Sequence, residues 1–215
     1  MLEKLPGALG HLLGGQRAGI ENIVFNTIDL RAGTAKITLT SPAFVDHAPI
    51  PPEYTADGAG ISPEIDWTGV PPSAASLALI VEDADSPTPA PLVHAIAVDI
   101  DPKRTQLKEG ELLNTDGKES RDISLGRNSY LRQAWLPPDP PRGHGVHRYA
   151  FQLFALAAGA PFHDAPGRND LVAALRSRAI ASGCLIGTYT RDKPISIKDE
   201  KATTESAVTG VPATD

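Results

Sequence analysis

The stretch that decides the fold is SLALIVEDADSPTPAPLVHAIAVDI, which runs from Ser76 to Ile100. It holds two short apolar runs, residues 76–82 and 93–100, separated by a polar linker that contains three prolines. Short apolar runs bounded by turn residues are typical of strands in the core of a β-sandwich. The stretch therefore predicts two buried strands joined by a stiff connection.

Three further segments have the pattern of strands: residues 35–40, 146–156 and 184–190. One helix is expected before the last of them, because Asn169 or Asp170 can cap its start and Gly183 can end it. Several strands with one late helix predict a mostly β protein, an antiparallel β-sandwich with a helix at its edge. They do not fit alternating βαβ units.

Proline and glycine are frequent, at 20 and 19 of the 215 residues. Because proline breaks helices and glycine weakens them, this composition excludes a coiled coil or a long-helix bundle. A hydrophobic content of 41% argues against disorder. We expect a helical or irregular leader at residues 1–34, one domain at 35–197 and a flexible tail at 198–215.

The charge and cysteine counts restrict the partners. The net charge of −6 argues against a nucleic-acid-binding protein, because such proteins usually present a basic face. The single cysteine, Cys184, cannot form an internal disulfide, and no apolar run is long enough for a transmembrane segment. Neither a P-loop nor a dinucleotide-binding glycine motif is present. We therefore expect a cytoplasmic protein without a cofactor.

An acidic cluster lies where the first apolar run ends: Glu82, Asp83 and Asp85 precede Ser86 and Pro87. Taken alone, such a cluster is more often a solvated turn in which Asp85 and Ser86 bond to the backbone. In the functional interpretation, Asp83 faces a cavity, where it holds an ammonium group or shares a proton with a phosphate.

A histidine begins the next apolar run. His94 lies between Val93 and Ala95, and a lone histidine among apolar neighbours is more often a core residue than a ligand. Its position supports the functional interpretation. If the two strands are neighbours, Asp83 and His94 come to the same end of the sheet.

The third candidate is PPDPPRGHGVHRY, residues 137–149. The prolines stiffen the loop before the long strand, and His147 and Tyr149 lie two apart, so they point to the same face. An imidazole and a phenol side by side make a donor pair for an oxyanion such as phosphate. The alternative is that Tyr149 belongs to a plain core face. Arg148 points the other way and is expected in a structural ion pair.

Metal binding and nucleophilic catalysis are weaker interpretations. Asp139, His144 and His147 lack the spacing of a helical metal site, so we expect no metal. There is no Gly-x-Ser-x-Gly elbow, and Cys184 is expected to be a buried small apolar residue.

These motifs resemble those of the phosphatidylethanolamine-binding protein family, in its bacterial Raf-kinase-inhibitor-like branch. The resemblance runs from about Ile37 to Arg191. EDADSP at 82–87 is similar to the family motif Asp-Pro-Asp-Ala-Pro, with Ala84 and Ser86 as departures. The segment at 137–156 is similar to the motif Gly-x-Pro-Pro-x-Gly-x-x-His-Arg-Tyr.

The resemblance implies a large central sheet packed on a smaller one and an anion pocket at one end of the sheet. The family's pocket takes phosphate-type groups, including the phosphoethanolamine head group. Carried over residue by residue, its wall is Asp83, His94, Pro140, Pro141, His147 and Tyr149, and its floor is shaped by Asp85 and Pro87.

One departure concerns the pocket mouth, where Asp139 stands in place of the family's glycine or cysteine. A carboxylate there repels an anion unless it turns to solvent or pairs with Arg142 or His144. Asp139 therefore favours a zwitterionic or cationic ligand, or a pocket that has lost its function.

Three functions remain open. The first is a non-catalytic binding protein for a small phosphorylated or zwitterionic ligand, which regulates a kinase or protease partner. The second is a hydrolase that uses Asp83 with His94 or His147 as acid and base. The third is a structural or partner-binding role that needs no ligand. We favour the first, and the resemblance also implies a homodimer.

Overall fold

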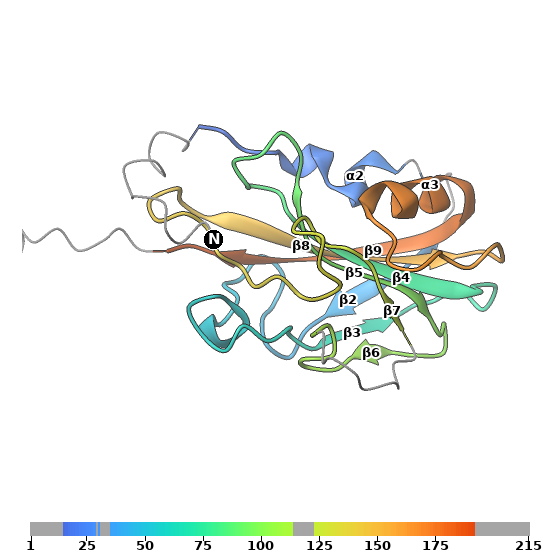
Figure 1. Cartoon of the computed structure of the whole chain (residues 1–215). Coiled ribbons are helices and arrows are strands. Elements are labelled where there is room, and N and C mark those ends of the chain that lie inside the picture. Colours follow the sequence, from blue (N-terminus) through green and yellow to red (C-terminus); the bar gives the residue numbers. More distant parts are fainter. Residues whose placement is uncertain (1–14, 29, 31–34, 114–122, 192–215) are drawn as a thin grey trace, which may run out of the picture.

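The computed structural model describes residues 15–28, 30, 35–113 and 123–191 (Figure 1). At its centre, strand β4 (Ser76–Asp83) pairs in antiparallel fashion with β5 (Leu92–Ile100) on one side and β8 (His147–Leu156) on the other. All residues of β4 after the first are buried. Because both faces of the sheet are covered, the strand has a continuous apolar run and no alternation. The two strands predicted from the opening stretch are confirmed, and they are neighbours.

The large sheet has six strands in the order β1-β9-β8-β4-β5-β7. Its neighbours are antiparallel except at one edge, where β1 runs parallel to β9. The other strands of this sheet are β1 (Ala35–Lys36), β7 (Ser124–Leu125) and β9 (Ala179–Tyr189). The fold is therefore mostly β, with one short parallel pair in an otherwise antiparallel sheet.

A small antiparallel sheet covers one face of the large one, in the order β2-β3-β6. Figure 1 shows this sheet on one side of the large sheet and helices α2 and α3 on the other. Two 3-10 turns complete the described elements. The bounds are β2 (Thr38–Thr40), β3 (Ile65–Thr68), β6 (Gln106–Leu107), α2 (Val24–Thr27), α3 (Arg168–Arg178) and the 3-10 turns Ile20–Asn22 and Pro52–Tyr54.

Strand β4 supplies side chains to two hydrophobic cores. Leu77, Leu79 and Val81 belong to the core between the two sheets. Ala78 and Ile80 belong to the core beneath the helices. Because successive side chains of a strand point to opposite faces, one apolar strand holds the two layers together. Its last residue, Asp83, is thereby held firmly at the end of the sheet.

The segment 35–40, expected to be one strand, is divided between the sheets. Residues 35–36 form β1 in the large sheet and 38–40 form β2 in the small one. The chain crosses at Ile37, whose backbone N–H donates to the Ser182 carbonyl at 2.9 Å. The predicted alternation of buried and exposed side chains is confirmed, since Ile37 and Leu39 are buried and Thr38 and Thr40 are exposed. Such an alternation cannot show that the chain passes from one sheet to the other.

The end predicted for the late helix is wrong. Helix α3 ends at Arg178, and Gly183 lies inside β9, opposite Leu153. A Cβ atom at Gly183 would lie 2.2 Å from the Ile37 carbonyl oxygen. Only a glycine at this position leaves room for the backbone that crosses at Ile37. The predicted cap is also displaced: the N-cap is Gly167, and the Asp170 carboxylate accepts its N–H at 2.8 Å.

Replacing Gly183 by alanine is therefore expected to lower the free energy of unfolding by about 1–3 kcal/mol, the usual cost of overpacking. The added methyl group meets backbone, which cannot move aside as a side chain can. Chemical denaturation of the variant measures the effect. Gly15→Ala is the matched control, because nothing lies within 4 Å of a Cβ at Gly15. Equal midpoints for both variants would contradict this account of the crossing.

The described part of the predicted leader packs on the large sheet through buried Ile23, Val24 and Ile28. The boundaries of the leader and the domain stay predictions, and the predicted tail at 198–215 lies outside the described residues. Among the helices that the structure describes, none has the length and apolar character needed to span a membrane.

Candidate functional site

The candidate site lies at one end of the large sheet, where three neighbouring strands end or begin. Asp83 is the last residue of β4 and is paired with Leu92 in β5 and Tyr149 in β8. His94 is near the start of β5, and His147 is the first residue of β8. Residues that are 64 positions apart in the chain, Asp83 and His147, are in this way brought into direct contact.

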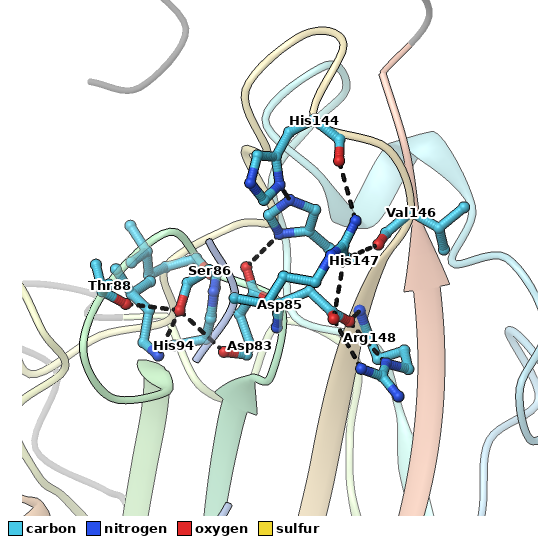
Figure 2. Close-up of polar contacts among 12 residues, drawn as sticks. Asp83, Asp85, Ser86, Thr88, His94, His144, Val146, His147 and Arg148 are labelled. Carbon is cyan, nitrogen blue, oxygen red and sulfur yellow. Dashed lines mark hydrogen bonds and ion pairs between the residues drawn. The ribbon is translucent and has the colours of Figure 1, made fainter. Parts of the chain in front are cut away.

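A chain of hydrogen bonds joins Asp83, His147 and His144 (Figure 2). The Nδ1–H of His147 donates to Asp83 Oδ2 at 2.7 Å, and the Nε2 of His147 lies 2.7 Å from Nδ1 of His144. The other Asp83 oxygen accepts the backbone N–H of Asp85 at 2.8 Å. The side chains of Asp83, His144 and His147 are all buried. The carboxylate therefore orients His147, but both nitrogens of this ring are already engaged.

His94 is held by the backbone of the proline-rich loop. Its Nδ1 lies 2.6 Å from the Leu136 carbonyl oxygen. Its Nε2 is buried and has no hydrogen-bond partner within the part of the chain that the structure describes. Burial lowers the pKa of His94, although Asp83 acts in the opposite sense. The ring is therefore neutral near pH 7, with one nitrogen left unsatisfied.

Tyr149 lies two residues after His147 in β8, opposite Asp83 of β4. Its ring meets the His94 ring edge-on at 5.1 Å and stacks on His147 at 6.4 Å. The hydroxyl is buried and has no partner among the described residues. Burial and then the nearby Asp83 raise the pKa of Tyr149 well above its usual value, so the hydroxyl keeps its hydrogen.

A small cavity of about 40 Å³ opens beside these residues. A single water molecule needs roughly 10–15 Å³ of such space, so the cavity holds a group of a few atoms. Among the residues predicted for the site, the cavity is lined by Asp83, Pro87, His94, Asp139, Pro140, Pro141 and His147. Other parts of its wall come from Ser86, Leu92, Tyr130, Leu136 and Pro137. Tyr149 and Asp85 are not among the lining residues.

Asp139 lines the cavity and is paired with Arg191, an arginine that lies in none of the predicted site motifs. Arg191, just after β9, donates to Asp139 Oδ1 and also to both oxygens of Asp57, at 2.6 and 2.7 Å. The Arg191 side chain is 4% exposed. The carboxylate at the cavity mouth is thus partly neutralised, which reduces its repulsion of an anion.

Asp85, predicted to shape the pocket floor, is held in place by two arginines. Arg148 donates to both Asp85 oxygens at 2.7 Å, and Arg17 approaches one of them at 2.9 Å. The structural ion pair expected for Arg148 is present. Arg17 also donates to the carbonyl oxygens of His144 and Val146, so it ties the rim loop to this carboxylate. Nothing in the pattern around Arg17 indicates this contact.

Asp85 is expected to make the free energy of unfolding depend on pH in the acid range. Hydrogen bonds from Arg148 and Arg17 outweigh burial and lower the Asp85 pKa from 3.8 to about 2. A carboxyl with a depressed folded pKa contributes stability above its unfolded pKa, and this contribution is lost as the pH falls from about 4 to 2. Urea midpoints measured across that window are expected to fall less steeply in Asp85→Asn than in the parent. Parallel curves would contradict the assignment.

In the described part of the chain, no three histidine, cysteine, aspartate or glutamate residues are grouped to hold a metal ion. Cys184 is half-buried, and burial raises the pKa of its thiol to about 12, which keeps it unreactive.

Comparison with known proteins places the chain in a family. The family model for phosphatidylethanolamine-binding proteins matches residues 40–190. The UPF0098 protein of Aquifex aeolicus is 36% identical over 178 residues, which cover 80% of this chain and 98% of the relative. The UPF0098 protein of Methanothermobacter thermautotrophicus is 36% identical over 156 residues, with 72% and 99% covered.

Solved structures agree with this match. A phosphatidylethanolamine-binding protein homologue from Chlamydia trachomatis has a TM-score of 0.65 and 33% identity, covering 73% of this chain and 99% of its own. E. coli YbcL has a TM-score of 0.67 at 24% identity, covering 72% and 98%, and shares the fold. The family model and these relatives match the segment that carries both the two-sheet fold and the Asp83–His147 site, and this chain therefore belongs to the phosphatidylethanolamine-binding protein family.

Proposed function

We propose that this chain is a non-catalytic binding protein whose cavity takes a phosphate-type group, such as a phosphoethanolamine-like head group. The observation that carries the proposal is the buried Nε2 of His94 in the wall of a small cavity, which has no hydrogen-bond partner among the described residues. A buried polar atom without a partner costs free energy, and a bound polar group is a common reason for keeping one.

The size and frame of the cavity support a small head group. Ligand pockets for whole drug-sized molecules usually measure about 300–1,000 Å³. This cavity, of about 40 Å³, admits only a compact group, so the rest of a larger ligand would extend outside. Four prolines in the wall, Pro87, Pro137, Pro140 and Pro141, restrict the backbone of the rim and favour a preformed site.

The charges near the cavity are consistent with a zwitterionic ligand. Asp83 and Asp139 offer carboxylate oxygens that accept hydrogen bonds from an ammonium group, as in ethanolamine. Arg191 offsets part of the negative charge at the mouth. A phosphate with an attached amine would use both kinds of group, and this agrees with the preference expected from Asp139.

A hydrolase is the second candidate, because a buried carboxylate oriented toward a histidine is the arrangement of a general base. Ser86 lines the cavity and would be the nearby nucleophile of such a hydrolase. Its hydroxyl group is already engaged in hydrogen bonds with the Thr88 hydroxyl, the Asp83 carbonyl oxygen and the Leu92 N–H. This observation favours binding over covalent catalysis.

One experiment separates the two candidates. Equilibrium binding of inorganic phosphate and O-phosphoethanolamine is measured by calorimetry, and the same preparation is assayed with a panel of phosphoesters and esters. We expect saturable binding and no turnover. Turnover by the parent protein that is lost in the His94→Ala variant would contradict the binding proposal and support the hydrolase.

Kinase or protease regulation, the homodimer, the cytoplasmic location and the assignment to the Raf-kinase-inhibitor-like branch stay predictions. The cytoplasmic location follows from the single cysteine and the lack of a long apolar run. The other three follow from the resemblance of the motifs at 82–87 and 137–156 to that branch.

A further inference from the structure

A wide groove lies beside the small cavity and has a different lining. It measures about 820 Å³ and is formed by residues 87–93, 127–131 and 167–168; we call it the Leu131 groove. It shares part of one wall with the cavity, but Asp83, His94 and His147 are not among its lining residues. Its volume is in the usual range of binding pockets, so it has room for several side chains of a bound molecule.

A rigid turn, residues 128–132, forms part of the wall of this groove. It is built around Asn128, which is 3% exposed. The side-chain oxygen of Asn128 accepts two backbone N–H groups of the turn, at 2.9 and 3.1 Å. The turn is also fixed to β5, because the Ser129 hydroxyl accepts the Val93 N–H at 2.8 Å. The side chains on this turn are therefore held in place before any partner binds, which reduces the entropy lost on binding.

Leu131 projects from this turn into solvent at a cost to the fold. It is 78% exposed, the highest fraction among the large hydrophobic residues that the structure describes. Its φ angle is +60°, in the left-handed region, which is unfavourable for a leucine and easier for glycine or asparagine. Neither burial nor backbone conformation favours a leucine here, and residues held in such conformations are found mainly at functional sites. Tyr130 beside it is 41% exposed, so the two side chains form an apolar ridge along the groove.

The groove is basic although the protein is acidic. The net charge of the chain is −6, yet none of the lining residues carries a carboxylate and two of them are arginines. Arg168 is paired with the buried Glu82 at 2.7 Å, so its charge is already balanced. Arg127 is exposed, and Asp170, the acidic residue of α3, is bonded to the Gly167 N–H. Arg127 thus presents a guanidinium group beside the apolar ridge, where it can hold a carboxylate in a bidentate pair.

We propose that the Leu131 groove is a docking site for a short acidic segment of a partner protein. In the bound complex, an apolar side chain of the segment packs on Leu131 and Tyr130, and a neighbouring carboxylate accepts hydrogen bonds from Arg127. The wall at 87–91 contains three prolines, whose restricted backbone favours a preformed site for an extended segment. This inference is independent of the ligand proposed for the small cavity, because it uses none of the Asp83, His94 or His147 side chains.

A selection from a library of random short peptides without phosphate groups tests the proposal. The full-length protein is the bait, in a buffer free of phosphate. We expect the selected peptides to be enriched in aspartate and glutamate next to a large apolar residue. Fluorescence anisotropy then measures the affinity of the strongest binder. Leu131→Asp and Arg127→Glu are each expected to weaken its binding by about tenfold or more, the effect of removing a central contact or reversing a paired charge.

Two exposed residues outside the groove provide matched controls. Val45→Asp places the same charge on an apolar residue that is 74% exposed, and Arg176→Glu reverses an exposed arginine of α3. Both controls are expected to leave the affinity unchanged. If they weaken binding as much as the groove variants do, the peptides respond to overall charge and the proposal is wrong. A selection that yields no binder, or binders without an excess of acidic residues, also contradicts it.

Leu131→Asn separates binding from folding. Asparagine enters the left-handed region more readily than leucine, so the midpoint of thermal unfolding is expected to stay the same or rise, while peptide binding is expected to weaken. A lower midpoint would show that Leu131 supports the fold, and the argument from its exposure would fail. Sedimentation of the peptide-free protein gives the last outcome. If the parent is a dimer and Leu131→Asp is a monomer, the groove is an interface between two copies of this chain, and the proposal of a separate partner fails.

Discussion

Glu82→Ala is expected to lower the free energy of unfolding by about 2–5 kcal/mol, because two buried donors lose their acceptor at a cost of about 1–3 kcal/mol each. Glu82 is fully buried in β4 and joins three parts of the fold. Its oxygens accept from the Val24 backbone N–H at 2.7 Å, from Gln152 Nε2 at 2.9 Å and from Arg168 Nε at 2.7 Å. Alanine leaves these donors without their acceptor and adds a cavity.

Chemical denaturation measures the loss. Glu82→Gln keeps the volume and one acceptor oxygen, so its loss is expected to be smaller than that of the alanine variant. Glu111→Ala is the control, because Glu111 pairs with Arg104 while 23% exposed, and a partly solvated ion pair contributes only about 0–1 kcal/mol. If Glu82→Ala lost no more stability than Glu111→Ala, Glu82 would not be the junction between β4, the N-terminal segment and α3.

His94→Phe is expected to weaken the binding of inorganic phosphate by about tenfold or more, since the ligand then loses its partner at the cavity wall. Phenylalanine keeps the approximate size of the ring, and with it the contacts to Tyr149 and Trp135. It removes the unpartnered Nε2 together with the hydrogen bond to Leu136. The effect is therefore expected mainly in binding, with a smaller loss of stability.

Calorimetric titration measures the affinity, and a thermal melt of each protein confirms that it is folded. His163→Phe is the matched control, because its ring is 58% exposed and lies before α3, away from the cavity lining. A folded His94→Phe protein that binds phosphate as tightly as the His163→Phe control would remove His94 from the site.

The strands that carry the site could be predicted because their signals are local. Residues 76–82 and 93–100 are apolar runs closed by turn residues, and both are strands of the large sheet. The site motifs lie at the ends of these strands, so Asp83 and His94 could be placed together once the strands were taken as neighbours. The short strands β6 and β7, two residues each, have no pattern that could have revealed them.

Features that depend on contacts between distant segments could not be predicted. Nothing near Arg191 indicates that it reaches Asp139, 52 residues earlier in the chain. The role of Gly183 depends on the chain crossing at Ile37, whose backbone lies against it. The sequence alone does not distinguish a glycine that permits such a close backbone contact from one that ends a helix. The acidic turn was ambiguous for a similar reason: Asp83 lines the cavity, whereas Asp85 is bonded to Arg148 and Arg17.

The most direct test of the central claim, that this cavity takes a phosphate-type group, is an NMR titration of the histidine rings with inorganic phosphate near pH 6, where imidazole signals are sensitive to their surroundings. The account predicts saturable shifts of the His94 and His147 ring signals, with a single affinity for both. The exposed rings of His47 and His163 serve as internal controls and are expected to move little. Unchanged His94 and His147 signals at high phosphate, or equal shifts of all four rings, would contradict the claim.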